Sequence, residues 1–243
     1  MCLLIMIRDF DPHYPTVVAS NRDESRLRVA SPPGLFVAST TRILSPRDRR
    51  AGGTWLGLND RSVFAGITNV AADQDQPRDT SRGELPHLAL DHVDLSDGIA
   101  AVRERCAQAE FNSFQLLVAD GSRAVVLRQS SGTLEESVAE ERIVVLSNEH
   151  GLGELELDRL TDVLAPGLSF DQRIGELKAV LLDEGESGGH RVLKRGGEFG
   201  TVSSSILAIP RADVGSLLWL YAQGDPAVTA YRNYGNLGRR LLG

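Results

Sequence analysis

The second residue of the chain is a cysteine, and this position has chemical consequences. If the initiator Met1 is removed, Cys2 carries a thiol and a free α-amine in the same residue. The reference pKa of a thiol is about 8.5 and that of an α-amine is about 7.7 to 8, so moving the proton between them costs on the order of 1 kcal/mol. The amine can then act as the general base for its own side chain. Cys2 is therefore a candidate nucleophile that needs no separate histidine.

The same cysteine also has a purely structural interpretation. With Met1 retained, the nitrogen is an amide without a usable lone pair, and the thiol depends on its neighbours for activation. A cysteine in a short apolar run is most often a small buried hydrophobic residue. The small side chain of Cys2 makes removal of Met1 plausible, and the sequence leaves both states of the terminus open.

A predicted β-hairpin follows this cysteine. Residues 2–7 are apolar, residues 9–15 contain turn formers and two prolines, and residues 16–19 resume an apolar run. We expect an antiparallel pairing of Ile7 with Thr16.

The hairpin register determines which groups surround the thiol. In the expected register Cys2 lies opposite Asn21, and Arg22 and Asp23 lie beside the sulfur. A guanidinium in that position favours the thiolate, and a carboxylate holds the protonated amine. A shift of one residue would reverse every side chain, so the register is a hypothesis.

The hairpin ends in the tetrapeptide Asn21-Arg22-Asp23-Glu24, and further motifs follow it along the chain. These motifs are AGGTWLG at 51–57, ITN at 67–69, SRGEL at 81–85, FNSFQLLVAD at 111–120 and LSN at 146–148. As a set and in this order, they resemble the NRDE family, which is also called the transport and Golgi organisation family.

The resemblance implies an α+β fold of the N-terminal nucleophile (Ntn) hydrolase type. This fold is a four-layer αββα sandwich, in which two antiparallel sheets stack face to face and helices cover both outer sides. The implied relatives are cholylglycine hydrolase and penicillin V acylase. The five implied site residues are Cys2, Arg22, Asp23, Asn69 and Asn148.

The resemblance also implies a role for each site residue. Cys2 attacks a carbonyl carbon, Asn148 and Asn69 stabilise the oxyanion, and Arg22 and Asp23 tune the terminus. The chain departs from the family pattern at Val202, where an arginine usually follows Gly-Thr, and at Ser25, where an aromatic residue usually follows the tetrapeptide. Both departures concern the substrate pocket more than the scaffold.

Two functions fit these observations. The first is an N-terminal cysteine amidohydrolase that acts through Cys2 on a non-peptide N-acyl amide and needs no cofactor. The second is a non-catalytic binding or trafficking protein on the same scaffold, because the resemblance includes eukaryotic members associated with haem and acyl-CoA or lipid handling. The expected partner is therefore a small-molecule amide or an amphipathic anionic ligand. A third possibility is that the motifs serve packing alone.

Composition limits the number of domains, the classes of binding partner and the cellular locations that we expect for this chain. The 243 residues are 42% hydrophobic, which is enough for one core, so we expect a single domain over residues 1–243. A net charge of −7 argues against binding to nucleic acid or anionic membranes by bulk attraction. The sequence contains no run long enough to span a membrane and no secretory signal pattern. Two distant cysteines predict neither a disulfide framework nor a zinc motif, and a cytoplasmic location fits best.

The rest of the chain predicts a mixed set of elements. Residues 29–50 read as a loop in which Arg42, Arg47, Arg49 and Arg50 are solvated or, as a minority alternative, clamp an anion. Ser81 and Glu84 have capping-box spacing ahead of a helix. The further expected strands lie at 35–37, 55–58, 63–68, 114–118, 124–127, 143–146, 206–209, 217–222 and 228–234, and the further helices at 96–109, with Cys106 in the core, 155–164 and 171–182.

Overall fold

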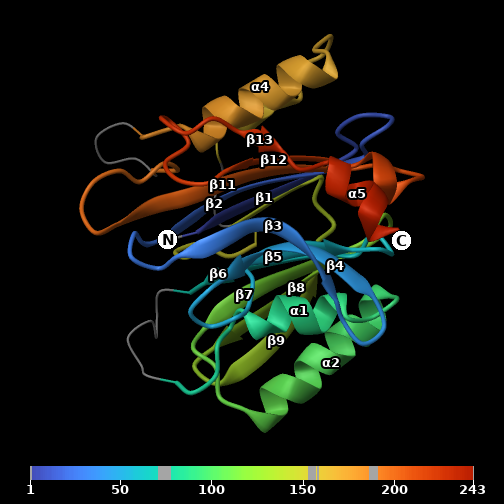
Figure 1. The fold of residues 1–243 in the computed structure, drawn as a ribbon, viewed down its shortest axis with the longest axis vertical. Coiled ribbons are helices and arrows are strands. Elements are labelled where there is room, and N and C mark those ends of the chain that lie inside the picture. Colours follow the sequence, from blue (N-terminus) through green and yellow to red (C-terminus); the bar gives the residue numbers. More distant parts are fainter. Residues whose placement is uncertain (1, 71–77, 153–156, 158, 186–190, 243) are drawn as a thin grey trace.

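The computed structural model describes residues 2–70, 78–152, 157, 159–185 and 191–242. Two antiparallel sheets form its centre (Figure 1). The first sheet contains, in spatial order, β10 (Ile143–Ser147), β1 (Leu3–Arg8), β2 (Thr16–Ser25), β11 (Phe199–Ile209), β12 (Leu218–Ala222) and β13 (Arg232–Asn233). The second contains β3 (Ala30–Val37), β4 (Arg42–Asp48), β5 (Leu56–Asn59), β6 (Phe64–Asn69), β7 (Phe114–Ala119), β8 (Ala124–Ser130) and β9 (Thr133–Val138).

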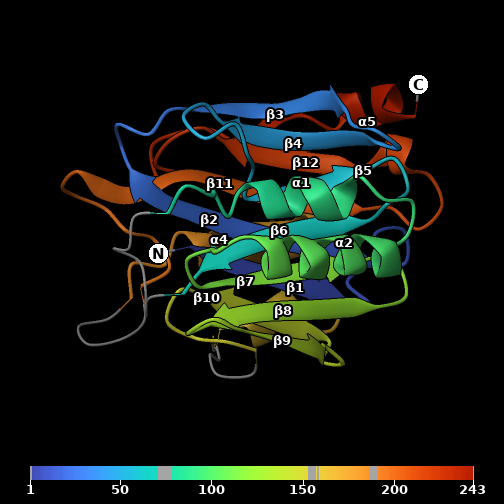
Figure 2. The ribbon, with the colours of Figure 1, turned by 90° about the horizontal axis from the view of Figure 1, so that it is seen from below.

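Helices cover the outer faces of the two sheets. On the first sheet lie α3 (Arg159–Val163) and α4 (Phe170–Leu181), and on the second lie α1 (Glu84–Leu90) and α2 (Leu95–Gln108), side by side in Figure 2. A short helix, α5 (Asn236–Leu241), packs against a 3-10 turn at Val214–Ser216. The predicted α+β architecture of four αββα layers is confirmed. Among the residues that the structure describes, no helix combines the length and apolar character that crossing a bilayer requires.

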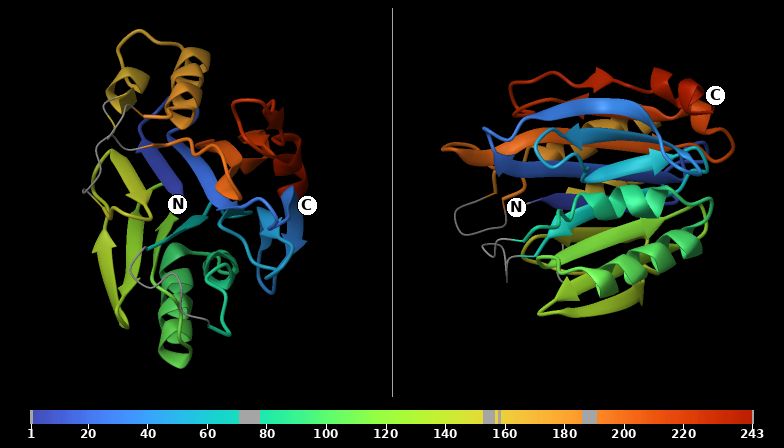
Figure 3. Two further views of the ribbon diagram at one scale, coloured as in Figure 1. Left: turned by 90° about the vertical axis from the view of Figure 1, so that its left-hand side faces the viewer. Right: turned by 60° about the horizontal axis from the view of Figure 1, so that its bottom comes forward.

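Strand β1 shows how the layers are built. Leu3, Ile5 and Ile7 belong to a core shared with α3 and α4, whereas Leu4 and Met6 belong to the core between the two sheets. Successive side chains of a strand point to opposite faces, and both faces of β1 are covered. The continuous apolar run at the start of the chain therefore encodes an inner strand of the first sheet, and Figure 3 shows the second sheet packed against that sheet.

The predicted hairpin exists, but its expected register is wrong by one residue. Ile7 pairs with Val17 and Leu3 pairs with Asn21, so the partner of Thr16 is Arg8. Register is well specified when one face is apolar and the other polar. Here both faces are buried, so the apolar pattern has no alternation that distinguishes neighbouring registers.

The strand predicted at 35–37 lies in β3, but the loop expected over the rest of residues 29–50 is wrong, because this segment forms β3 and β4. Strand β3 is an edge strand, where proline is tolerated because no neighbour needs its missing N–H. The register between β3 and β4 shifts between Ser31 and Gly34, which accommodates the two intervening prolines. The Pro- and Arg-rich composition thus reflects a sheet edge.

The predicted capping box at Ser81 and Glu84 does not form. Helix α1 begins at Glu84 without a side-chain cap, and the Ser81 hydroxyl accepts a bond from the Gly83 nitrogen at 3.3 Å. The Glu84 carboxylate accepts a bond from Arg105 Nε at 2.7 Å. The residues of this motif therefore do not serve to cap α1.

The other predictions divide as follows. The hairpin around Asp120, strand β10, helix α2 and helix α4 are where the sequence predicts them, and Cys106 is partly exposed while packing against the core. Strand β9 was not predicted, because its residues are mostly exposed and polar. Of the predicted strand at 228–234 only β13 is formed. Residues 155, 156 and 158 of the helix predicted at 155–164 lie outside the described residues, and so do residues 186–190.

Candidate active site

Cys2 lies just before β1, opposite Asn148 at the end of β10. Leu3 pairs with Ser147 in an antiparallel ladder, so Cys2, which precedes Leu3, lies opposite Asn148, which follows Ser147. The Cys2 backbone nitrogen donates a hydrogen bond to Oδ1 of Asn148 at 2.8 Å. The nitrogen that removal of Met1 would turn into an amine is therefore held by a side chain distant in sequence.

The Cys2 thiol is partly exposed and lies near the tetrapeptide. Its sulfur is 3.9 Å from the backbone carbonyl oxygen of Asp23, which accepts a weak S–H hydrogen bond. Burial raises the pKa of the Cys2 thiol, the Asp23 carboxylate adds to the rise, and the Arg22 guanidinium opposes it. The thiol is therefore favoured in its protonated form, and a base is needed to generate the thiolate.

The Asp23 carboxyl group is buried on the same part of β2. Thr201 Oγ1 donates a hydrogen bond to Asp23 Oδ1 at 2.6 Å, and the Lys194 backbone nitrogen donates to Thr201 Oγ1 at 3.0 Å. Burial raises the pKa of Asp23 to about 6, although the bond from Thr201 and the charge of Lys194 act in the opposite direction. Asp23 consequently loses its proton close to neutral pH.

Val202, one of the two departures from the family pattern, lies in a β-bulge. Thr201 pairs with Asp23 and Ser203 pairs with Arg22, so Val202 is the extra residue of β11. A bulge increases the local twist and redirects side chains. At this bulge the Thr201 hydroxyl donates its hydrogen bond to the Asp23 carboxylate.

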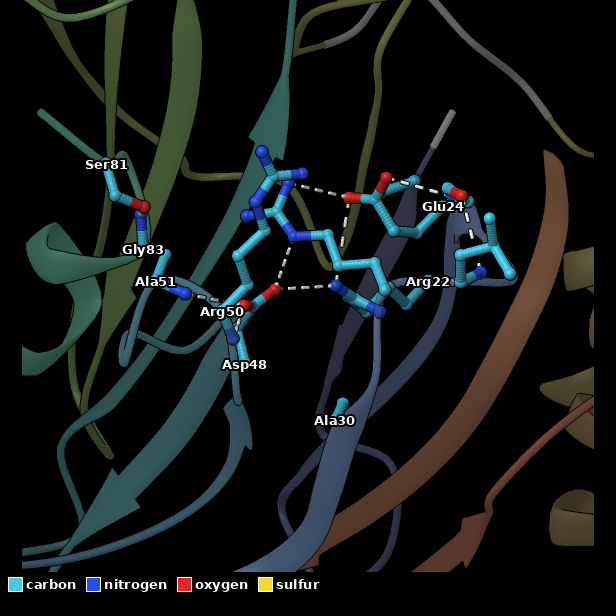
Figure 4. A network of polar contacts seen from close by, with 12 residues as sticks. Arg22, Glu24, Ala30, Asp48, Arg50, Ala51, Ser81 and Gly83 are labelled. Carbon is cyan, nitrogen blue, oxygen red and sulfur yellow. Dashed lines mark hydrogen bonds and ion pairs between the residues drawn. The ribbon is translucent and has the colours of Figure 1, made fainter. Parts of the chain in front are cut away.

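The Arg22 guanidinium is only 5% exposed and bonds to a carboxylate of the second sheet. Its Nη2 donates to Asp48 Oδ2 at 2.9 Å, and its guanidinium carbon lies 4.4 Å from the centroid of the Trp55 ring. Asp48 also accepts a bond from Arg28 Nε at 2.7 Å (Figure 4). Burial alone would raise the pKa of Asp48, but the Ala51 backbone N–H and the Arg28 guanidinium lower it. This ion-pair cluster joins the two sheets.

Asn69, the fifth predicted site residue, is the last residue of β6 and is partly exposed. Within the described part of the chain its side chain makes no hydrogen bond. Its neighbour Thr68 pairs with Gln115, whose Nε2 donates to the Ser147 carbonyl at 2.9 Å. Asn69 therefore lies at the same end of the sandwich as Asn148, and its role in the oxyanion site stays a prediction.

The structure thus brings together Cys2, Asp23 and Asn148, with Arg22 in electrostatic reach of the thiol. Asp48 and Thr201, two partners of the tetrapeptide, were not predicted from the sequence. One feature of the sequence pointed to Thr201: it follows Gly200 in the segment where the chain departs from the family pattern. No feature of the sequence pointed to Asp48, because it lies in the segment that was predicted to be a loop. No group of three or more His, Cys, Asp or Glu side chains among the described residues is placed to bind a metal ion.

Comparison with known proteins identifies the family. The profile described as Transport and Golgi organisation 2 matches residues 1–163. This chain belongs to the Transport and Golgi organisation 2 family. A mouse Transport and Golgi organization 2 homolog is 30% identical over 131 residues, covering 49% of this chain and 45% of the mouse protein. The human homolog is 32% identical over 135 residues, covering 51% of this chain and 47% of the human protein. The matched region thus spans about half the length of these relatives.

Solved structures resemble this Transport and Golgi organisation 2 family member in fold. The C2A mutant of a conjugated bile acid hydrolase from Clostridium perfringens superposes with a TM-score of 0.54 at 9% identity, covering 100% of this chain and 94% of that enzyme. An N-acylethanolamine-hydrolyzing acid amidase ortholog from Caenorhabditis elegans gives a TM-score of 0.54 at 12% identity, covering 85% and 92%. These similarities show the Ntn-hydrolase fold, which is compatible with amidohydrolase chemistry, and at this identity they show the fold alone.

Proposed function

We propose that the protein is an N-terminal cysteine amidohydrolase that cleaves a non-peptide N-acyl amide through Cys2. The observation that carries this proposal is the hydrogen bond from the Cys2 nitrogen to Asn148 Oδ1 at 2.8 Å, together with the thiol 3.9 Å from the Asp23 carbonyl. These contacts hold the nitrogen and the sulfur of one residue at the end of the sandwich, where a terminal amine could serve as the base for its own thiol.

The first half of the proposed reaction forms a thioester. The amine of Cys2 takes the thiol proton, and the thiolate attacks the amide carbonyl carbon, so that a C–S bond forms and the carbonyl oxygen becomes an oxyanion. Donors from Asn69 and from Nδ2 of Asn148 would stabilise that charge. The ammonium then returns the proton to the leaving nitrogen as the C–N bond breaks.

The second half releases the acid. The Cys2 amine takes a proton from water, and the resulting hydroxide attacks the thioester carbonyl. The C–S bond then breaks, and the ammonium returns its proton to the sulfur to regenerate the thiol. Asp23, when ionised, would stabilise the protonated amine formed in each half. Arg22 would favour the thiolate electrostatically while its bond to Asp48 keeps it in place.

Covalent labelling tests this proposal. Purified protein is treated with a β-lactone probe, and intact-mass spectrometry reports both the loss of Met1 and the acylation. We expect one acyl group on protein that lacks Met1, and none on the Cys2→Ala variant. The Cys106→Ala variant is the matched control and should label like the wild type. Labelling that survives Cys2→Ala would overturn the assignment.

The binding function is favoured by one specific property, the burial that raises the pKa of the Cys2 thiol. If Met1 is retained, the Cys2 nitrogen is an amide that cannot act as a base, and burial favours the protonated thiol. In that case the same site would bind a ligand without turnover. A saturable Soret shift on titration with haem, or a calorimetric signal with an acyl-CoA, would then identify the ligand class.

A further inference from the structure

Arg82, the second residue of the SRGEL motif, lies at the same end of the sandwich as Cys2. Its Nη1 donates a hydrogen bond to the Ser113 carbonyl at 2.9 Å. The same carbonyl accepts the backbone N–H of Val70 at 3.1 Å, and Val70 directly follows Asn69. The Arg82 guanidinium is thus anchored at the end of β6 and β7, where Asn69 lies.

The backbone that carries Arg82 is tightly held. The Gly83 carbonyl accepts the Thr54 backbone N–H at 2.9 Å, and the Arg82 carbonyl accepts that of Leu85 at 3.1 Å. A Cβ atom on Gly53 would lie 2.4 Å from the Gly83 backbone, so the two segments are in direct contact. Arg82 therefore projects from a fixed position, as a residue that positions a ligand must. Figure 4 shows Ser81 and Gly83, its two neighbours, beside the strand that carries Asp48.

The Arg82 guanidinium is within electrostatic reach of the proposed nucleophile. Burial lowers the pKa of Arg82 from its ordinary value, whereas the negative charges of an ionised Cys2 thiol and of Glu24 raise it. The contact to Ser113 holds the guanidinium beside the start of β7, at the end of the sandwich where Cys2 lies.

Arg82 differs from the other arginines near the site in its partners. Arg22 and Arg28 both bond to Asp48, at 2.9 and 2.7 Å. Arg82 bonds to a neutral carbonyl, and within the described part of the chain it forms no ion pair with a carboxylate. Its Nε and Nη2 donors also have no hydrogen-bond partner among those residues. A partly buried guanidinium with two adjacent free donors suits the two oxygens of a carboxylate.

We propose that Arg82 is a specificity-determining residue that binds the carboxylate of an anionic amide, so that the preferred substrate class of the Cys2 site is the N-acyl amino acids. In such a substrate the carboxylate is one carbon away from the amide nitrogen. It would lie against Arg82 while the amide carbonyl faces Cys2. This inference rests on the proposed hydrolase function and adds the chemical class of the substrate.

The test compares two substrates with the same acyl chain and amide, N-decanoylglycine, which ends in a carboxylate, and N-decanoylethanolamine, which ends in a neutral hydroxymethyl group. Their kcat/KM values are measured on the wild type and on Arg82→Gln, which keeps an amide donor for Ser113 but removes the charge. Loss of a charge-assisted bond should lower kcat/KM for N-decanoylglycine by about 10- to 100-fold and leave N-decanoylethanolamine within about twofold. Arg82→Lys keeps the charge, so this variant should retain part of the preference for N-decanoylglycine. Its thermal midpoint should equal that of the wild type.

Arg50→Gln is the matched control, because Arg50 is exposed and forms no ion pair with any described residue. It removes one positive charge near Asp48 without touching the anchored guanidinium. We expect the preference for N-decanoylglycine to persist in this variant. An equal loss in Arg50→Gln and Arg82→Gln, or an equal loss for both substrates in Arg82→Gln, would overturn the inference.

A binding measurement separates this inference from the hydrolase proposal. Calorimetry on the Cys2→Ala protein reports the affinity for both compounds without turnover. If the wild type hydrolyses neither compound, but Cys2→Ala binds N-decanoylglycine more tightly than N-decanoylethanolamine and Cys2→Ala/Arg82→Gln does not, the hydrolase proposal fails and the anion site stands. Equal affinities in both proteins would overturn the anion site itself.

Discussion

The two cysteines of this chain are alike in exposure but differ in their surroundings. Both Cys2 and Cys106 are partly exposed, and burial raises the pKa of both thiols, that of Cys106 to about 11. Cys106 lies on α2 and packs against the core beside Arg105 and Glu84. The backbone nitrogen of Cys2, unlike that of Cys106, becomes a free amine if Met1 is removed, and it donates a hydrogen bond to Asn148 Oδ1. The comparison teaches that a possible base in a fixed position, and not exposure or the pKa of the sulfur, distinguishes the candidate nucleophile.

The largest expected effect comes from blocking the base of Cys2. A fusion protein that a site-specific protease cleaves directly before Cys2 can be compared before and after cleavage. Because general-base assistance is worth about 10²- to 10⁴-fold, the acylation rate should rise by that order on cleavage. Stopped-flow or timed mass spectrometry measures the rate, and the labelling of Cys106 should not change. Equal rates in both forms would remove the amine from the mechanism.

Removing the side chain that holds the nitrogen should have the next largest effect. In Asn148→Leu the Cys2 nitrogen loses its acceptor at nearly constant side-chain volume. Hydrogen bonds to charged groups contribute about 1.5 to 3 kcal/mol, so we expect acylation to slow by about 10- to 100-fold. Asn236→Leu, on the exposed face of α5, is the control and should react like the wild type.

The environment of Cys2 should also appear in the pH dependence of stability through Asp23. The pKa of the folded-state carboxyl is about 6, above its ordinary value of 3.8, so the folded state binds the proton more tightly than the unfolded state does. The free energy of unfolding should therefore fall as the pH rises from about 4 to 6, by roughly 3 kcal/mol in total.

Urea unfolding at a series of pH values measures this slope. Asp23→Asn should flatten the slope, because the variant has no proton to lose at that position. Asp97→Asn, at the exposed start of α2, should keep the wild-type slope. A slope that is unchanged in Asp23→Asn would mean that this carboxyl does not titrate in the stated window.

The smallest effect is expected at Cys106. With a thiol pKa of about 11, its alkylation by iodoacetamide should accelerate up to about pH 11 and be slow at neutral pH. Cys106→Ala should lower the free energy of unfolding by only about 1 kcal/mol, since the side chain is small and partly exposed. Fast alkylation of Cys106 at pH 7 would contradict the difference between the two thiols.

The sequence alone determined the classes of element and the candidate chemistry. Apolar runs with turn formers between them predicted most of the central strands, because both faces of those strands are covered by another layer. The motif set, met in order along the chain, indicated the family and the Ntn-type sandwich. Cys2 and the tetrapeptide were identifiable because their side chains have chemistry that packing does not require.

Within the tetrapeptide, only the structure separates the roles of its residues. Asn21 Nδ2 bonds to the carbonyls of Leu181 and Val192 on the helix-covered face of β2. Arg22 points to the opposite face and bonds to Asp48 of the second sheet. Side chains alternate along a strand, so this division follows from the period of two once the strand is placed in the sheet.

Tertiary structure alone decided which distant residues meet. The order β10-β1-β2-β11 places Asn148 beside Cys2 and Thr201 beside Asp23, and the contact between the two sheets places Asp48 against Arg22. The register of β1 on β2 was likewise undetermined by the sequence, because a strand buried on both faces has no polar side to align. Local patterns determine which segments become strands, whereas pairing order and register depend on the packing of the whole sandwich.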